Sequence, residues 1–161
     1  MRLPFLLAVA ALASATPALA QPASPASAQA QEAEVLAVVN RLWEAMRKRD
    51  SAMARTVFDT SARMIRVAER NGVRSISWSR VDGFVANIGG GPEPWIERMV
   101  RPEVRVDQNI ASVWTWYDFT RNGQLSHCGY DSIELARGAD GWKIVYVSDT
   151  RIPAPCSPPE P

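Results

Sequence analysis

The residues that could move a proton lie close together in the last third of the chain. His127 is the only histidine among 161 residues, and Asp118 and Asp131 stand on either side of it. A carboxylate beside a histidine orients the ring and favours its charged form, so that the histidine can act as a general base. A carboxylate buried among apolar side chains has a raised pKa and can act as a general base itself. The sequence therefore offers two proton-transfer candidates, the Asp118–His127 pair and Asp131. The alternative for each is a structural hydrogen bond, which Tyr146 would supply to Asp131.

The expected pairing of these residues follows from two turns. Asn122-Gly123 is typical of a two-residue hairpin turn, which places Asp118 opposite His127. A second turn at 137–140 extends the pairing to a third strand. One face of these strands then carries the acid–base candidates together with aromatic and aliphatic side chains: Trp114, Trp116, Asp118, Leu125, His127, Asp131, Ile133, Leu135, Trp142, Ile144 and Tyr146.

That face is expected to line a cavity. On the opposite face Glu134 lies across from Lys143, and an ion pair of this kind belongs toward solvent. Apolar walls with a few converging polar groups are typical of a ligand pocket. We therefore predict that Trp114, Trp116 and Tyr146 contact a small apolar or aromatic molecule.

A preceding hairpin argues against this assignment of the two faces. Pairing the residues on either side of Gln108-Asn109 in the same way turns Val104 and Val106 outward. Either a bulge near Pro102 or a reversal of the two faces would remove the conflict, because a shift of one residue moves every side chain of a strand to the other face.

Several other chemistries lack the residues that they need. One histidine and two cysteines supply no zinc site, and the sequence contains neither a G-x-G-x-x-G motif nor a serine-nucleophile motif. Gly89-Gly90-Gly91 is not followed by the Lys-Ser/Thr of a phosphate-binding loop. The balance of 18 Lys and Arg against 17 Asp and Glu gives no basic footprint for nucleic acid. We expect no metal, no cofactor and no nucleic-acid partner.

Residues 1–20 are typical of a secretory signal peptide. Arg2 is followed by the apolar stretch Leu3–Leu12 and then by Ala18-Leu19-Ala20, a cleavage site of the A-x-A type. The apolar stretch is too short to span a membrane. We predict cleavage after Ala20 and an exported protein without a membrane anchor, found in the periplasm or the medium.

The two cysteines suit an oxidising compartment. Cys156 lies in a Pro-rich tail, residues 153–161, that cannot continue a strand because proline lacks an N–H group. We predict a Cys128–Cys156 disulfide that holds this tail against the outer face of the sheet, over Tyr117. If the thiols are free instead, Cys128 becomes a candidate reactive group beside His127.

The domain that positions these residues is expected to span residues 32–152. Residues 21–31 are rich in Pro, Ser, Ala and Gln without periodicity, and are expected to be a mobile leader. Apolar residues recur at helical spacing from Glu32 to Arg49, and Asp50 is a suitable N-cap for a second helix. A third short helix is predicted between Ser79 and the glycines that begin at residue 89.

Strands are predicted elsewhere in the domain. Alternating residues on both sides of Asn71-Gly72 indicate a hairpin. Four further strands are expected at 95–106, 110–120, 124–136 and 142–150. The result is an α+β fold in which three helices from the first half of the chain pack on one face of a curved, mostly antiparallel sheet.

The segment YDFTRNGQLSHCGYDSIELARGADGWKIVYVSDTR, residues 117–151, contains HCG-x-D and D-G-W-K-I blocks. With the order of elements over roughly Glu32 to Ile152, it resembles the nuclear transport factor 2-like superfamily, which includes SnoaL-like cyclases and ketosteroid isomerases. The resemblance is closest to small exported bacterial members, some described as lumazine-binding proteins. It implies a cone-shaped fold with a concave pocket, a general base at Asp131 and a homodimer formed through the sheet.

Two functional hypotheses follow. The first is an exported, non-catalytic protein that holds a small apolar or aromatic molecule in an aromatic-lined pocket. The second is a cofactor-independent isomerase, dehydratase or cyclase, in which Asp131 or the Asp118–His127 pair moves a proton and Tyr146 stabilises a developing oxyanion. The superfamily contains both kinds of protein, so the fold does not decide between them.

Overall fold

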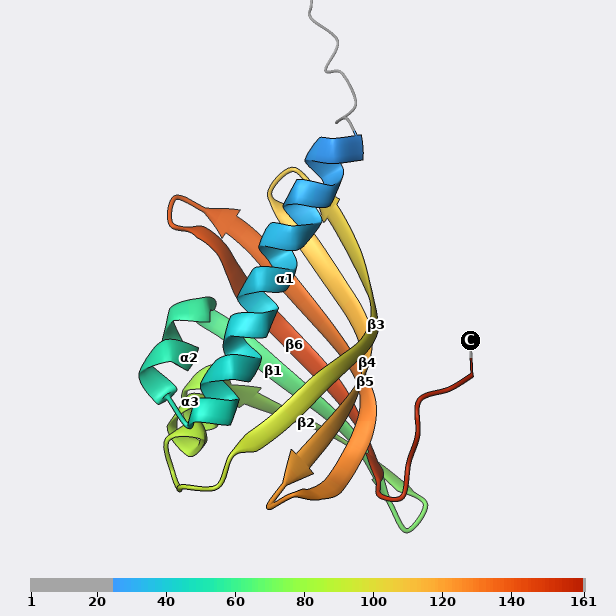
Figure 1. Ribbon diagram of the computed structural model, residues 1–161. Coiled ribbons are helices and arrows are strands. Elements are labelled where there is room, and N and C mark those ends of the chain that lie inside the picture. The colour runs from blue at the N-terminus through green and yellow to red at the C-terminus, as the bar shows by residue number, and fades with distance from the viewer. Residues whose placement is uncertain (1–24, 161) are drawn as a thin grey trace, which may run out of the picture.

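Three helices lie across one face of a six-stranded sheet in the part of the chain that the structure describes, residues 25–160 of a computed structural model (Figure 1). The helices are α1 (Pro25–Lys48), α2 (Ser51–Val57) and α3 (Val81–Ile88). The strands are β1 (Phe58–Arg70), β2 (Val73–Arg80), β3 (Trp95–Asp107), β4 (Ile110–Arg121), β5 (Gln124–Gly138) and β6 (Gly141–Pro153). No helix within residues 25–160 is long and apolar enough to cross a membrane. The predicted signal peptide lies outside the described residues.

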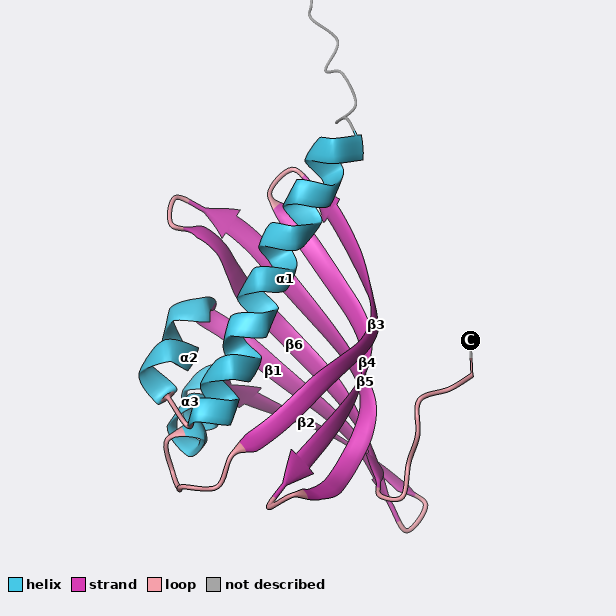
Figure 2. Cartoon of the chain, viewed as in Figure 1, coloured by secondary structure: helices cyan, strands magenta, loops and turns pink. Residues whose placement is uncertain are grey.

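The strands are ordered β2-β1-β6-β5-β4-β3 across the sheet. Neighbouring strands are antiparallel except β1 and β6, which run parallel. The sheet is long, curved and open, and all three helices cover its concave side (Figure 2). The predicted α+β fold class is therefore confirmed.

Helix α1 covers the sheet because one side of it is apolar. Residues at helical spacing on that side are buried in the core: Val35, Val39, Leu42 and Met46. The helix begins at Pro25 rather than at the predicted Glu32, so the described part of the predicted leader is helical.

A tight connection joins α1 to α2. Arg49 takes a left-handed conformation with a φ of 60°, which ends α1. Asp50 then caps α2 as predicted, since its carboxylate accepts a hydrogen bond of 2.8 Å from the backbone N–H of Met53.

An irregularity in β3 decides which of its side chains face the helices. The pairing with β4 shifts between Val100 and Glu103, and Arg101 has a φ of 53°. On the turn side of this bulge, Val104 pairs with Val113 and Val106 pairs with Ala111, and both valines pack against the core with these buried residues of β4. Beyond the bulge the alternation is reversed, so that Glu97 pairs with inward-facing Phe119. The bulge near Pro102, one of the two alternatives for this hairpin, is present, but it is the other alternative, a reversal of faces in β4, that turns Val104 and Val106 inward.

A second bulge lies in β5. Phe119 pairs with His127 and Thr120 pairs with Leu125, so Ser126 is an extra residue without a partner in β4. His127, Asp131, Ile133 and Leu135 stay on the inner face, as predicted. Leu125, on the other side of the extra residue, pairs with Thr120 and is exposed rather than inward-facing. Strand β4 is turned over relative to the prediction.

The reversal of β4 corrects three of the predicted positions. Thr115 and Tyr117 are the fully buried residues that face the helices. Trp114, Trp116 and Asp118 lie on the outer face instead. The sequence analysis missed this because an inserted residue beyond the turn leaves the turn itself, Asn122-Gly123, unchanged.

A third bulge turns Tyr146 outward. Leu135 pairs with Ile144, but Glu134 pairs with Tyr146, so Val145 is the extra residue. Val147 takes the inward position after it and is 5% exposed. Asp131 pairs with Asp149 instead, so the expectation that Tyr146 would supply a hydrogen bond to Asp131 is wrong.

The C-terminal tail runs along the outer side of the sheet, away from the helices (Figure 1). The predicted disulfide is present: Cys128 and Cys156 are bonded, with their Cα atoms 6.1 Å apart. The backbone of Ala154 also donates a hydrogen bond of 3.3 Å to the carbonyl of Ser126. The tail does not cover Tyr117, however, because that side chain points to the inner face.

Candidate functional site

A continuous cavity lies between the helices and the inner face of the sheet. Its wide part has a volume of about 680 Å³ and is lined by residues of α1, α3 and five strands. A narrow extension of about 40 Å³ continues toward β5. Six residues line both parts and so join them: Met46, Met64, Arg66, Phe84, Glu97 and Arg151. We call the two parts together the cone cavity.

One wall of the wide part is aromatic. Phe84 from α3, Trp95 from β3 and Phe119 from β4 form a row in which neighbouring ring centroids are 6.4 and 6.0 Å apart. Met64 from β1 lines the same space. These side chains give an organic molecule an apolar surface to contact.

Two carboxyl groups meet in the cone cavity. Glu97 on β3 and Asp131 on β5 are joined by a side-chain hydrogen bond, which requires one of them to hold a proton. Burial raises the pKa of Glu97 to about 7. Burial, and then the negative charges of Glu97 and Asp149, raise the pKa of Asp131 well above its ordinary value. The pair therefore carries a proton at neutral pH.

The two members of the carboxyl pair differ in access. Asp131 is 3% exposed and lines the narrow extension, and its Oδ2 atom is buried without a hydrogen-bond partner. Glu97 is partly exposed and lines both parts of the cavity. A molecule in the wide part would thus meet Glu97 first, with Asp131 behind it.

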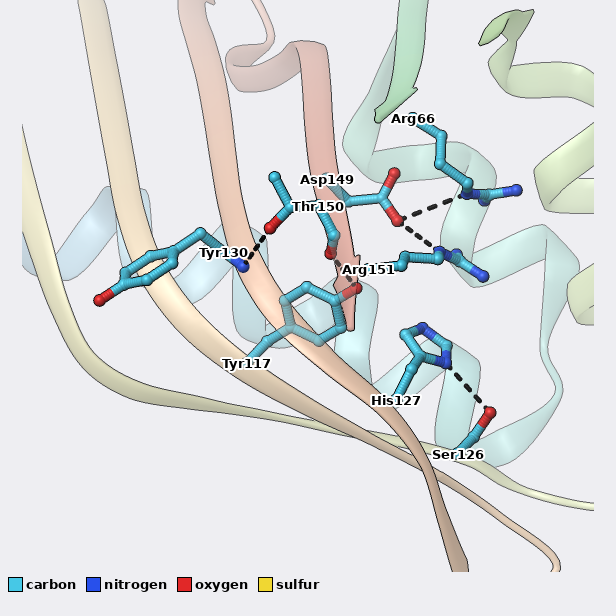
Figure 3. Close-up of polar contacts among 8 residues, drawn as sticks. All are labelled: Arg66, Tyr117, Ser126, His127, Tyr130, Asp149, Thr150 and Arg151. Carbon is cyan, nitrogen blue, oxygen red and sulfur yellow. Dashed lines mark hydrogen bonds and ion pairs between the residues drawn. The ribbon is translucent and has the colours of Figure 1, made fainter. Parts of the chain in front are cut away.

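Two arginines converge on a third acidic group beside this pair. The Asp149 carboxylate lies 2.7 Å from Nε of Arg151 and 3.5 Å from Nε of Arg66 (Figure 3). Both arginines line the wide and the narrow parts of the cavity. Asp149 thus forms ion pairs with two arginines, whereas Glu97 and Asp131 have no ion pair in the described part of the chain.

His127 lies near this group but is held apart from it. Its Nδ1 atom is 3.0 Å from the Ser126 hydroxyl (Figure 3). Its ring packs against Phe119 and Tyr117 at centroid distances of 4.8 and 5.8 Å. Burial, followed by the positive charge of Arg151, lowers the pKa of His127 to about 4. The imidazole is therefore neutral at physiological pH.

The predicted Asp118–His127 pair does not form. Asp118 lies on the outer face of β4, where its two carboxylate oxygens accept hydrogen bonds of 2.9 and 2.7 Å from Arg98. The partner expected to favour charged His127 is thus on the other side of the sheet, and the shift in the histidine pKa is opposite to the expected one. His127 does not line the cone cavity either.

The predicted ligand-contacting aromatics form an outer cluster instead. Trp114 is 48% exposed and stacks on Tyr130 at a centroid distance of 4.9 Å, and Trp116 meets the same ring edge-on at 5.3 Å. Tyr146 is turned outward by the bulge at Val145. None of the three predicted contacts lines the cone cavity. The predicted homodimer through the sheet stays a prediction.

The sequence analysis missed Glu97, which the structure places at the centre of the site. The sequence does indicate this residue, because Trp95, Glu97 and Met99 share one face of β3. A charged side chain between two apolar ones on an inner face is a candidate functional group. The bulge at Arg101 hid that signal, because it reverses the alternation in the second half of the strand. Within residues 25–160 no group of three His, Cys, Asp or Glu side chains could hold a metal ion.

The fold has many solved counterparts, although no protein-family model and no curated protein matches the sequence. A nuclear transport factor 2-like protein of unknown function from Shewanella baltica is 16% identical, with a TM-score of 0.61, over 83% of this chain and 100% of that one. A member of the same superfamily from Salmonella enterica is 21% identical, with a TM-score of 0.61, over 80% and 95% of the two chains.

A third counterpart comes from a larger enzyme. It is the beta subunit of a protein from Novosphingobium aromaticivorans assigned as an aromatic-ring-hydroxylating dioxygenase. It is 11% identical, with a TM-score of 0.62, over 78% of this chain and 91% of that subunit. The similarity in all three cases is one of structure, and this chain has the nuclear transport factor 2-like fold.

Proposed function

We propose that the protein binds a small organic molecule in the cone cavity. The observation that supports this most directly is the cavity of about 680 Å³, walled on one side by Phe84, Trp95 and Phe119 and on the others by polar and charged groups. A volume of this size is typical of small-molecule sites, and the aromatic wall supplies the apolar contact while the polar groups can fix the orientation of a ligand. This proposal keeps the predicted ligand class but moves the contacts from the predicted aromatics to this row.

Export is a second part of the proposal. It rests on the signal-peptide pattern of residues 1–20, and the Cys128–Cys156 disulfide is compatible with an oxidising compartment. Mass spectrometry of the mature protein is the test. A chain that begins after Ala20 would support export, and a chain that retains Met1 would contradict it.

Filling the cavity tests the binding proposal. Gly83 lines the wide part, and a Cβ atom added there would meet nothing within 4 Å, so Gly83→Phe introduces a ring without displacing the backbone. Ala86→Phe, at an exposed position of the same helix that does not line the cavity, is the matched control. Two fluorescent probes, neutral N-phenyl-1-naphthylamine and anionic 8-anilinonaphthalene-1-sulfonate, report on occupancy.

We expect at least one probe to bind the wild-type protein. The ring added by Gly83→Phe would occupy part of the binding site, so this variant should raise the dissociation constant of that probe about tenfold or more. Ala86→Phe should bind as the wild type does. If neither probe binds, or if both variants bind equally well, the cone cavity is not a ligand site.

A proton-transfer enzyme is the second candidate function, and the carboxyl pair favours it. A carboxyl group with a pKa near 7 that faces a ligand cavity can take a proton from a carbon atom beside a carbonyl group and return it. Glu97 would be the base in contact with substrate, with Asp131 behind it as the proton-sharing partner. His127 and Asp118 have no part in this reaction.

Exchange of a carbon-bound proton tests this candidate without knowledge of the substrate. In D2O, NMR would follow loss of the α-proton signals of 2-tetralone, a flat ketone, in the presence of the protein. Glu97→Gln should abolish any protein-dependent exchange, and Asp140→Asn, at an exposed turn, should not change it. Exchange that survives Glu97→Gln would exclude this role for the carboxyl pair.

A further inference from the structure

The wide part of the cone cavity carries more positive than negative side chains. Five arginines line it, and only two glutamates. Three of the arginines have acidic partners: Arg66 and Arg151 share Asp149, and Arg80 pairs with Asp82 at 3.1 Å. The remaining two, Arg49 and Arg121, form no ion pair with any residue in the described part of the chain.

Arg49 and Arg121 lie against the same indole ring. The guanidinium carbon of Arg49 is 4.2 Å from the centroid of the Trp95 ring, and that of Arg121 is 5.6 Å from it. Burial, and then the positive charge of Arg121, lower the pKa of Arg49, because the two neighbouring cations repel each other. Glu93 lies near enough to act on Arg49 in the opposite sense, but it forms no ion pair with it.

The donors of Arg49 are only partly used. Its Nε donates to the carbonyl of Gly91 at 2.9 Å, and Nη2 donates to the carbonyl of Asn87 at 3.0 Å. These bonds fix the side chain, while Nη1 is buried without an acceptor among residues 25–160. A buried donor without a partner is costly, and so is a pair of neighbouring like charges. An anion received between Arg49 and Arg121 would relieve both.

We infer that the ligand of the cone cavity is an organic anion, whose acidic group is held by Arg49 and Arg121 and whose apolar body lies against Phe84, Trp95 and Phe119. This rests on the proposed binding function and names the chemical class of its ligand. The planar, fixed guanidinium of Arg49 suits the two oxygens of a carboxylate, or the oxygens of a sulfonate or phosphate ester. The adjoining aromatic row requires that the anion carry a hydrophobic part.

The two fluorescent probes separate this inference from the proposed function. 8-Anilinonaphthalene-1-sulfonate is N-phenyl-1-naphthylamine with one added sulfonate group, so a difference in their affinities measures the contribution of the negative charge. We expect the anionic probe to bind the wild-type protein about tenfold more tightly than the neutral probe, as one charge-assisted contact implies. Raising NaCl from 0.05 to 0.5 M should reduce that advantage.

Variants then locate the charge. Arg121 is exposed and makes no hydrogen bond through its side chain in the described structure, so Arg121→Gln should leave the fold intact and reduce binding of the anionic probe about fivefold, without affecting the neutral probe. Arg49→Lys, which keeps one charge but loses the planar donors, should have the same selective effect. Arg105→Gln, on the outer face of β3, is the matched control.

Displacement of the anionic probe identifies the chemical class. 1-Naphthoate should displace it, whereas 1-naphthamide, the neutral amide of the same size, should do so far less well. Inorganic sulfate at the same concentration should not displace it, because sulfate has no apolar body; displacement by sulfate would indicate a simple anion site and overturn the inference. If the two fluorescent probes bind equally well and Gly83→Phe weakens the binding of both, the ligand need not be an anion and the inference is overturned. The proposal that the cone cavity binds a small organic molecule would still hold. If neither probe binds, both proposals fall.

Discussion

The buried histidine should make the protein unstable toward acid, and a single substitution should measure the effect. The pKa of His127 is about 4 in the folded protein, against an ordinary value of 6.5 that applies to the unfolded chain. A group with a lowered folded pKa contributes stability above its unfolded pKa, and that contribution is lost as the pH falls from 6.5 toward 4. Each unit of pKa difference is worth about 1.4 kcal/mol, so His127 should reduce the free energy of unfolding by about 2 to 3 kcal/mol between pH 7 and pH 4.

His127→Gln removes the titrating group and keeps a polar side chain that can bond to the Ser126 hydroxyl. The variant loses ring contacts with Phe119 and Tyr117, which costs stability equally at every pH. Urea unfolding of both proteins at pH 7, 6, 5 and 4, followed by tryptophan fluorescence, gives the free energies. The wild type should exceed the variant most at pH 7, and its advantage should shrink by about 2 to 3 kcal/mol at pH 4. All other titrating groups are common to the two proteins and drop out of the difference.

A direct titration provides the check on this reasoning. Because His127 is the only histidine, a single imidazole signal in the proton NMR spectrum reports its ionisation. Titration near pH 6.5 in the folded protein, or a difference in unfolding free energy that stays constant from pH 7 to pH 4, would refute the argument that burial keeps this side chain neutral.

Three further predictions concern the carboxyl pair, the disulfide and the spacing of two strands. Since the pKa of Asp131 is raised in the folded protein, its contribution to stability is present at low pH and is lost as the pH rises. In the same urea assay, the stability of Asp131→Asn relative to the wild type should therefore increase from pH 4 to pH 8, whereas that of the control Asp140→Asn should not change. Replacing both cysteines by serine should lower the free energy of unfolding by about 3 kcal/mol, from the loop entropy of a bridge between positions 28 residues apart, and an unchanged melting temperature would contradict this. In thermal unfolding, Gly129→Ala should lower the free energy of unfolding by at least about 3 kcal/mol, because the new Cβ would lie 2.0 Å from the carbonyl oxygen of Thr150. The control Gly138→Ala, whose Cβ would have nothing within 4 Å, should change it by less than about 0.5 kcal/mol.

The parts of the fold that depend on neighbouring residues were predictable from the sequence. The apolar stripe of α1, the Asp50 cap and the Asn122-Gly123 turn each need only a few residues in a row, and the structure contains all three. The disulfide was also predictable, since Cys128 and Cys156 are the only cysteines of the chain.

The facing of the strands was not predictable in the same way. Ser126 and Val145 are extra residues in otherwise regular strands, and neither carries a turn or proline signal. Each inserted residue reverses the facing of the residues beyond it, so that Trp116 and Tyr146 move outward. The Asn122-Gly123 turn is as predicted. The second turn is tighter than the predicted 137–140, since Arg137 pairs with Trp142 and Gly138 with Gly141, but this shift of two residues does not change the facing. The meeting of Glu97 with Asp131 depends in addition on three strands and two bulges, so no local pattern contains it.

The position of β6 has a consequence for how the protein folds. The last strand of the chain lies in the middle of the sheet, between β1 and β5. The β1–β2 hairpin is synthesised early but can join the rest of the sheet only through β6. In the pairing of β1 with β6, Phe58 lies opposite Ile144 and Ala68 lies opposite Arg151. Closing loops of that length costs entropy before any stabilising contact is made, which slows folding, and the edges of β1 and β5 stay unpaired until β6 has been synthesised. Without β6 the sheet would consist of two unconnected parts, the β1–β2 hairpin and the three strands β3–β5, rather than a smaller version of this domain.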